Sequence, residues 1–143
     1  MSSNLIEKLY LLPDDIIHIY IWPHISPNIK IWLNKSCYNQ YHLCVKNMIP
    51  ANIYDSYVRN VIRNDDYMVF DKLLLENFDK WIKILKYSYR EYIFYNYIFF
   101  LSHFAVENNS SNCSNQISFF LKKAGYEKKW HKKNSIKYIR WSN

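Results

Sequence analysis

The sequence predicts an all-α fold: a compact multi-helix domain of about six helices with a basic C-terminal tail. Half of the 143 residues are apolar and 19% are aromatic, so the chain can bury a core. One glycine and four prolines are too few for the many tight turns of sandwiches and barrels. Apolar residues also recur at helical spacing along most of the chain, which favours long helices.

The first helix is expected to begin at Pro13. Proline suits the first helical turn, and Asp14 and Asp15 place two carboxylates against the positive end of the helix dipole. Pro23 and Pro27 forbid a regular helix across residues 22–27. A second, amphipathic helix is expected over residues 28–48. Its apolar face would carry Ile29, Trp32, Leu33, Cys37, Tyr41, Cys44, Val45 and Met48, and its other side Lys30, Asn34, Lys35, Asn39, His42 and Lys46.

A helical bundle is expected over residues 51–125. Apolar stripes over residues 53–62 and 70–85 predict two helices, the second with a break near Asn77. The segment 91–106 is apolar nearly all round, as is typical of a central helix packed on several sides.

The end of the bundle is expected to contain a loop and a short helix. Asn and Ser dominate residues 107–115, which is typical of a loop or turn. The helix would run over residues 115–124, with Gly125 as the residue that closes it.

The chain is interpreted as one domain, residues 1–143, without a linker long enough to separate independent domains. It comprises residues 11–48, the bundle 51–125 and an aromatic basic tail, 126–143. An early Glu7 and Lys8 argue against a signal peptide, so an intracellular location is expected: cytoplasm, nucleus or virion. Three cysteines then indicate free thiols. The apolar run 92–106 is too short to span a membrane.

Patterns for catalysis, cofactors and metals are weak. A single glycine excludes glycine-rich phosphate loops and with them most nucleotide-dependent enzymes. The spacing of Cys37, His42 and Cys44 does not stack a metal site on one helix face, and buried thiols explain them better. A nucleophilic pair of Cys113 and His103 is a minor alternative. The acid pairs 14–15 and 65–66 are interpreted as helix caps, so we expect no enzyme, cofactor or metal.

Basic residues concentrate at the C-terminus, which carries the whole formal net charge of +7. Interleaved aromatic residues make this composition suitable for a phosphate backbone and for stacking on bases. A solvated lysine-rich end is the simpler interpretation, because lysines outnumber arginines and favour non-specific charge. The basic residues are Lys122, Lys123, Lys128, Lys129, Lys132, Lys133, Lys137 and Arg140.

The sequence Leu12-Pro13-Asp14-Asp15-Ile16-Ile17, followed by residues 31–38, resembles the F-box over residues 11–48. In that family the helices insert apolar side chains into a Skp1-type adaptor and so link a cullin ubiquitin ligase to whatever the rest of the chain binds. The double-proline connection around Trp22 departs from the pattern. By position, the resemblance implies adaptor contacts at Leu12, Pro13, Ile16, Ile17, Leu33 and Tyr38.

The Asn, Ile, Lys and Tyr bias is similar to that of short F-box-like proteins of large AT-rich DNA viruses, which often join the box to ankyrin repeats. Residues 105–125 resemble the second helix and closing glycine of one degenerate ankyrin unit, without its Thr-Pro-Leu-His opening and with extra loop residues.

Three functions remain open from sequence. The leading hypothesis is a non-enzymatic protein-interaction adaptor that binds a Skp1-type adaptor or another viral or host protein. The alternative is a basic nucleic-acid-binding or virion structural protein that uses its C-terminal tail. The third is an architectural subunit whose aromatic residues form interfaces.

Overall fold

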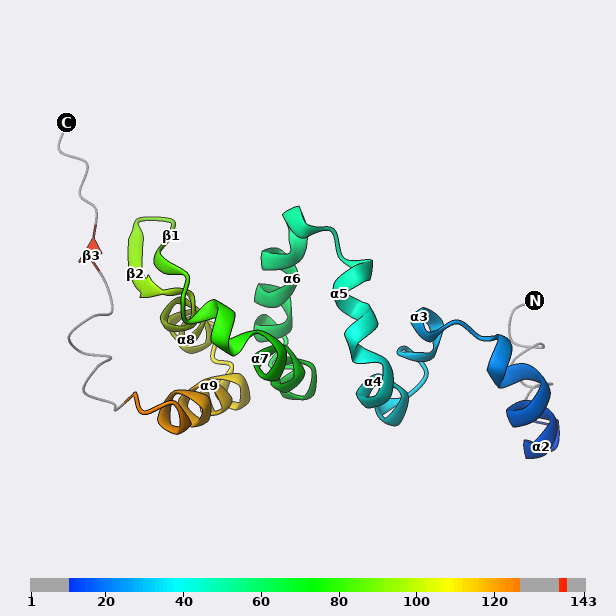
Figure 1. The fold of residues 1–143 in the computed structure, drawn as a ribbon. Helices are drawn as coiled ribbons and strands as arrows, with labels where there is room; N and C mark the ends of the chain where they lie inside the picture. Colours follow the sequence, from blue (N-terminus) through cyan, green and yellow to red (C-terminus); the bar gives the residue numbers. More distant parts are fainter. Residues whose placement is uncertain (1–10, 127–136, 139–143) are drawn as a thin grey trace. The chain divides into compact units, whose positions relative to one another are not determined.

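The computed structural model describes residues 11–126 and 137–138 (Figure 1). The expectation of a mainly helical protein is confirmed, although a small sheet is also present. The chain forms two compact units, unit 1 (Met1–Pro50) and unit 2 (Ala51–Asn143). Their boundary falls at the junction that separates the F-box-like segment from the bundle in the sequence.

Unit 1 is built from short helical segments. They are α2 (Asp14–Ile16), the π-helical turn η1 (Ile17–Ile21), the 3-10 turn η2 (Trp22–His24), α3 (Pro27–Lys30), α4 (Lys35–Tyr41), the 3-10 turn η3 (His42–Cys44) and α5 (Val45–Met48). The expected helix start is present, since Pro13 precedes α2 and Asp14 and Asp15 occupy its first turn. The expected break is present too, because α3 begins anew at Pro27.

The single amphipathic helix expected over residues 28–48 is wrong. The chain leaves α3 after Lys30, and Asn34, with extended backbone, caps a new helix: its Oδ1 accepts a hydrogen bond of 2.8 Å from the backbone N–H of Cys37. Because the second helix starts anew at Asn34, the buried and exposed sides expected for one continuous helix no longer apply. Lys30, placed on the polar side by the sequence pattern, is buried, whereas Ile29 and Trp32 are exposed.

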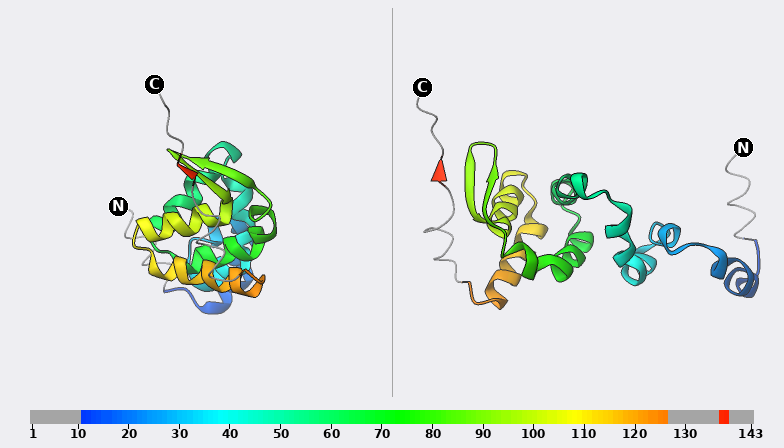
Figure 2. Two further views of the ribbon diagram at one scale, coloured as in Figure 1. Left: turned by 90° about the vertical axis from the view of Figure 1, so that its left-hand side faces the viewer. Right: turned by 45° about the horizontal axis from the view of Figure 1, so that its top comes forward.

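In its described residues, unit 2 has four longer helices whose buried side chains form one core. They are α6 (Ala51–Arg63), α7 (Tyr67–Trp81), α8 (Tyr97–Glu107) and α9 (Ser111–Lys123). Figure 2 shows the ribbon from two further directions. Helix α7 runs unbroken through Asn77, where the sequence suggested a break, because the Asn77 side chain is itself hydrogen-bonded, to the Leu73 carbonyl at 3.0 Å. Helix α8 is buried on most sides, as expected of the central helix.

A β-hairpin separates the two pairs of helices. Strands β1 (Leu85–Tyr89) and β2 (Tyr92–Asn96) are antiparallel, and Tyr89 pairs with Tyr92 across a two-residue turn. Arg90 in that turn has a left-handed φ of 53°. Strand β3 (Lys137–Tyr138) adds to the other edge of β2. The expected helix over 91–106 therefore begins only at Tyr97, and Leu85 belongs to a strand rather than to the preceding helix.

The loop expected over residues 107–115 is a short turn instead. Helix α8 ends at Glu107 and α9 begins at Ser111, four residues earlier than the sequence suggested. The reason lies in the backbone: Asn109 adopts a left-handed φ of 56°, which reverses the chain within three residues. At the other end of α9 the expectation is confirmed, because Gly125 has a φ of 84° and its N–H donates to the Lys122 carbonyl.

The α6–α7 and α8–α9 hairpins turn in the same way. In the first, the N–H groups of Asp65 and Asp66 donate to the carbonyls of Ile62 and Val61. In the second, the equivalent donors and acceptors lie 44 residues further along: Asn109 to Val106 and Ser110 to Ala105. Both turns are Schellman motifs with a left-handed residue after the helix. Because α6 packs on α8 and α7 on α9, unit 2 is a stack of two similar helical hairpins.

The two turns also hold each other. The Asp65 carboxylate accepts hydrogen bonds from the backbone N–H groups of Asn112 (3.2 Å) and Cys113 (2.9 Å), and so caps α9 from the neighbouring hairpin. The buried Ser110 hydroxyl donates in the opposite direction, to the Ile62 carbonyl. Asp66 caps its own helix, α7. Asp66 therefore has the capping role that its sequence position suggested, whereas Asp65 caps α9, a helix distant in the sequence.

Candidate protein-docking surface

Unit 1 exposes more of its large apolar side chains than it buries. Among its described residues, four hydrophobic side chains are buried: Ile31, Cys37, Tyr38 and Val45. Nine large hydrophobic side chains are exposed: Leu11, Leu12, Ile19, Tyr20, Ile29, Trp32, Leu33, Leu43 and Met48. Exposed apolar surface at this density is typical of a site that another macromolecule covers.

The six residues that the F-box resemblance indicated do not share one environment. Leu12 and Pro13, at the start of α2, are exposed, and Leu33, between α3 and α4, is 51% exposed. Ile16 and Ile17 are half-buried. Tyr38 is only 7% exposed and belongs to the small core of unit 1. Leu12, Pro13 and Leu33 are therefore the most accessible of the six, and Tyr38 is the least accessible.

A buried lysine holds the segments of unit 1 together. The Nζ atom of Lys30 lies 4.9 Å from the ring centroid of Trp22 and 5.5 Å from that of Tyr41. Trp22 belongs to η2 and Tyr41 ends α4, so the ammonium group bridges segments on either side of α3. Trp22 departs from the F-box pattern, and in the structure it has this structural role.

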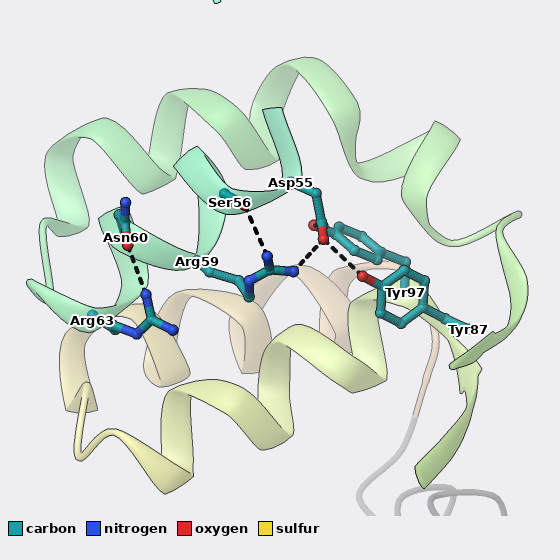
Figure 3. A network of polar contacts seen from close by, with 7 residues as sticks. All are labelled: Asp55, Ser56, Arg59, Asn60, Arg63, Tyr87 and Tyr97. Atoms are coloured by element: carbon teal, nitrogen blue, oxygen red, sulfur yellow. Dashed lines mark hydrogen bonds and ion pairs between the residues drawn. The ribbon is translucent and has the colours of Figure 1, made fainter. Parts of the chain in front are cut away.

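Unit 2 carries a polar network centred on Asp55, a residue of α6 (Figure 3). Its carboxylate accepts hydrogen bonds from the guanidinium of Arg59 and from the hydroxyls of Tyr97 and Tyr87, the last at 2.8 Å. Arg59 also donates to Ser56, at 3.0 Å. One carboxylate thus ties α6 to β1 and to α8.

The two phenols of this network are held in their neutral form. Burial raises the pKa of Tyr87 and Tyr97 far above the ordinary value, and hydrogen bonding to Asp55 and the charge of that carboxylate add to the effect. Both hydroxyls therefore remain donors over the physiological pH range. The arrangement fixes the hairpin against the helices.

Three arginines converge on the same part of unit 2. The guanidinium carbons of Arg59 and Arg90 each lie 5.3 Å from the centroid of the Tyr89 ring, and that of Arg63 lies 5.3 Å from Phe104. The Tyr89 and Phe104 rings are themselves 6.0 Å apart. This cluster, hereafter the arginine face, was missed by sequence reasoning. Its signal was the scarcity of arginine: three of the four in the chain form this cluster, and Arg140 is outside the described residues.

The thiol and metal patterns gain no support from the geometry. Cys37 and Cys113 are buried and Cys44 is half-buried, all as free thiols. Burial, the hydrogen bond to Asp65 and nearby carboxylates raise the pKa of Cys113 to about 12, which disfavours the nucleophilic thiolate. His103 pairs instead with Glu107, at 3.1 Å. Among the described residues, no group of three or more His, Cys, Asp or Glu side chains could hold a metal ion.

Most of the basic tail lies outside the described residues. Lys122 and Lys123 are exposed at the end of α9, and Lys137 is part of β3. The nucleic-acid hypothesis stays a prediction for these residues. Outside the described residues are Lys128, Lys129, Lys132, Lys133 and Arg140.

Comparisons with known proteins give no relative for this chain. No protein-family model matches it, and neither does any curated protein or solved structure. In the part of the chain that the structure describes, no helix has both the length and the apolar character needed to cross a bilayer.

Proposed function

We propose that this protein is a non-enzymatic adaptor in which unit 1 docks on a Skp1-type protein and unit 2 presents a second binding surface. The observation that carries the proposal is the imbalance in unit 1 between four buried and nine exposed large apolar side chains in its described residues. A segment with so little core gains most of its apolar burial from a partner.

The position of the exposed side chains supports the F-box assignment. Leu12 and Pro13 open the segment and Leu33 lies between α3 and α4, at positions where the resemblance implies adaptor contacts. In this arrangement apolar side chains from short helices enter grooves on the partner. Ile16 and Ile17, half-buried, would lose their remaining exposure on docking.

Binding of the purified full-length chain to a purified Skp1-type adaptor tests the proposal, by calorimetry or biolayer interferometry. The substitutions Leu12→Asp and Leu33→Asp place a carboxylate where the interface would exclude water. Because both side chains are exposed, the fold should tolerate the change. We expect affinity to fall about tenfold or more for each, as for a central apolar contact.

Leu75→Asp is the matched control. Leu75 is 59% exposed on α7 of unit 2, close to the 51% of Leu33, so the chemical change and the starting exposure are comparable. We expect this variant to bind the adaptor like the native chain. Absence of binding by the native chain, or equal loss with Leu75→Asp and Leu33→Asp, contradicts docking through unit 1.

A further inference from the structure

We infer that the arginine face of unit 2 binds an acidic peptide segment of a second protein, with Arg63 and Arg90 as the residues that hold its carboxylates. The inference rests on the proposed adaptor function and supplies the chemistry of its second partner. Arg59, Arg63, Tyr89, Arg90 and Phe104 form this face.

The three guanidinium groups are connected through two neighbouring aromatic rings, Tyr89 and Phe104. Arg59 and Arg63 are one turn apart on α6 and project from the same side of it (Figure 3). Arg90 reaches the group from the hairpin turn, since its guanidinium and that of Arg59 both lie 5.3 Å from the Tyr89 ring centroid. Arg63 joins through Phe104, whose ring is 6.0 Å from Tyr89.

The guanidinium of Arg59 forms an ion pair within the protein, whereas those of Arg63 and Arg90 form none in the described part of the chain. Arg59 is paired with Asp55 and bonded to Ser56. Arg63 donates one hydrogen bond, to the Asn60 side chain at 2.7 Å, which leaves most of its five N–H donors for a ligand. Within the described residues, neither Arg63 nor Arg90 has a carboxylate partner, and Glu91 beside Arg90 forms no ion pair with it.

The surrounding rings hold these side chains in place. Stacking of Arg90 on Tyr89 and of Arg63 on Phe104 restricts both guanidinium planes, which lowers the entropy lost when they bind a ligand. Tyr89 is in turn packed on Phe100, with ring centroids 4.8 Å apart. A planar, restricted guanidinium favours bidentate binding of a carboxylate.

The same packing favours a peptide over a nucleic acid. Phe104 is only 3% exposed, and the half-buried Tyr89 ring has two guanidinium groups near it, so this face offers bases little ring surface on which to stack. Asp55, the partner of Arg59 on α6, also lies beside this face and would repel a continuous chain of phosphates. A peptide with separated carboxylates avoids this repulsion.

Fluorescence anisotropy with the full chain tests the inference, using a short labelled peptide of alternating Glu and Ser. A Gln/Ser peptide and an oligothymidylate are the comparison probes. For Arg63→Gln combined with Arg90→Gln, we expect affinity for the acidic peptide to fall roughly tenfold. Binding of oligothymidylate should be unchanged, because any contact with it belongs to the basic tail.

Arg63→Lys combined with Arg90→Lys keeps the charge and removes the bidentate geometry. An intermediate loss of affinity supports recognition by guanidinium groups. The inference is overturned if the Gln variant binds the acidic peptide as tightly as the native chain does, or if the Gln/Ser peptide binds equally well. It is also overturned if the Gln variant loses oligothymidylate binding instead, which would make this face a nucleic-acid site.

Leu33→Asp separates this inference from the proposed function. That variant should lose the Skp1-type adaptor and keep the acidic peptide, whereas the double Gln variant should show the opposite pattern. Arg63 and Arg90 are exposed, so far-ultraviolet circular dichroism and thermal unfolding should match those of the native chain.

Discussion

Units 1 and 2 differ in what holds them together. In the described part of unit 2, nineteen buried hydrophobic residues form one core, and the two helical hairpins exchange capping interactions through Asp65 and Ser110. The described part of unit 1 has a small apolar core, a helix cap from Asn34 and the ammonium of Lys30 between two rings. Both units have apolar sequences, but among the described residues only unit 2 buries more large apolar side chains than it exposes. Apolar content thus indicates how much apolar surface a segment must remove from water. It does not indicate whether the segment buries that surface in its own core or against a partner.

The aromatic residues show the same contrast. In unit 2 the Phe100 ring lies within 4.6 Å of Tyr87 and 4.8 Å of Tyr89, measured between ring centroids. This centre joins the hairpin to α8. In unit 1, Trp32 is exposed, and the Trp22 ring contacts the ammonium group of Lys30. Unit 2 should therefore unfold as one cooperative structure, and unit 1 should have a lower stability of its own.

The largest expected effect comes from Phe100→Ala. Removing this fully buried ring should lower the free energy of unfolding of unit 2 by about 3–5 kcal/mol, because a cavity is left among the tyrosines. Urea denaturation followed by circular dichroism measures the change. Phe119→Ala is the matched control: Phe119 is 65% exposed, so its loss should cost less than about 0.5 kcal/mol.

Hydrogen exchange on the same variants tests the distinction between the units. Amides of α6–α9 should exchange faster in Phe100→Ala, while those of α4 in unit 1 keep their native rates. Equal acceleration in both units would show one cooperative structure and remove the contrast.

The helices of unit 2 follow from local patterns in the sequence. Apolar spacing predicted α6 and α7, the nearly continuous apolar segment 91–106 predicted α8 with too early a start, and Gly125 predicted the end of α9. The hairpin was missed because its aromatic residues satisfy a helical period as well as a strand period. The alternation of Leu85, Tyr87 and Tyr89 with polar residues was the available signal.

The similarity between the two helical hairpins of unit 2 cannot be detected by comparing their sequences. When residues 51–81 are aligned with residues 95–125, only Asn52 and Asn64 meet the same residue, at Asn96 and Asn108. The turns match through left-handed backbone at Asp65 and Asn109, which two different side chains tolerate. Backbone geometry is therefore duplicated without residue identity.

The two candidate sites also differ in how far local sequence patterns can predict them. The adaptor contacts implied by the F-box resemblance stay a prediction, and among them Leu12 and Leu33 are exposed whereas Tyr38 is buried. The arginine face depends on Arg90 meeting Arg59 across a tertiary contact, and no local pattern encodes that approach. Burial of Lys30 has the same origin, because rings from two other segments create its environment.

A smaller effect is expected at the contact between the two hairpins, for Asp65→Asn. Burial alone would raise the pKa of Asp65, but hydrogen bonds from the backbone N–H groups of Cys113 and Asn112 outweigh it and lower the pKa below its ordinary value. The folded state therefore binds fewer protons than the unfolded state, and its stability falls as pH drops below about 4. Above that pH, Asp65→Asn should cost about 1–2 kcal/mol.

The pH dependence identifies the charge as the cause. The difference in unfolding free energy between the native chain and Asp65→Asn should shrink as the pH is lowered from neutral into the acid range. Asp79→Asn is the control, because Asp79 is exposed on α7 and has no hydrogen bond in the described structure. A pH-independent difference would assign the cost to packing rather than to the carboxylate.

The smallest expected effect is in unit 1, for Trp22→Leu. The change removes one of the two rings that face the Lys30 ammonium, and a buried cation left with Tyr41 alone is less well compensated. We expect a loss of about 1 kcal/mol, seen as roughly fivefold faster hydrogen exchange in α4 with no change in α8. Trp32→Leu makes the same substitution at a side chain that is 68% exposed and should leave α4 unaffected. If both variants behave alike, the cation does not hold unit 1 together, and its small apolar core must do so unaided.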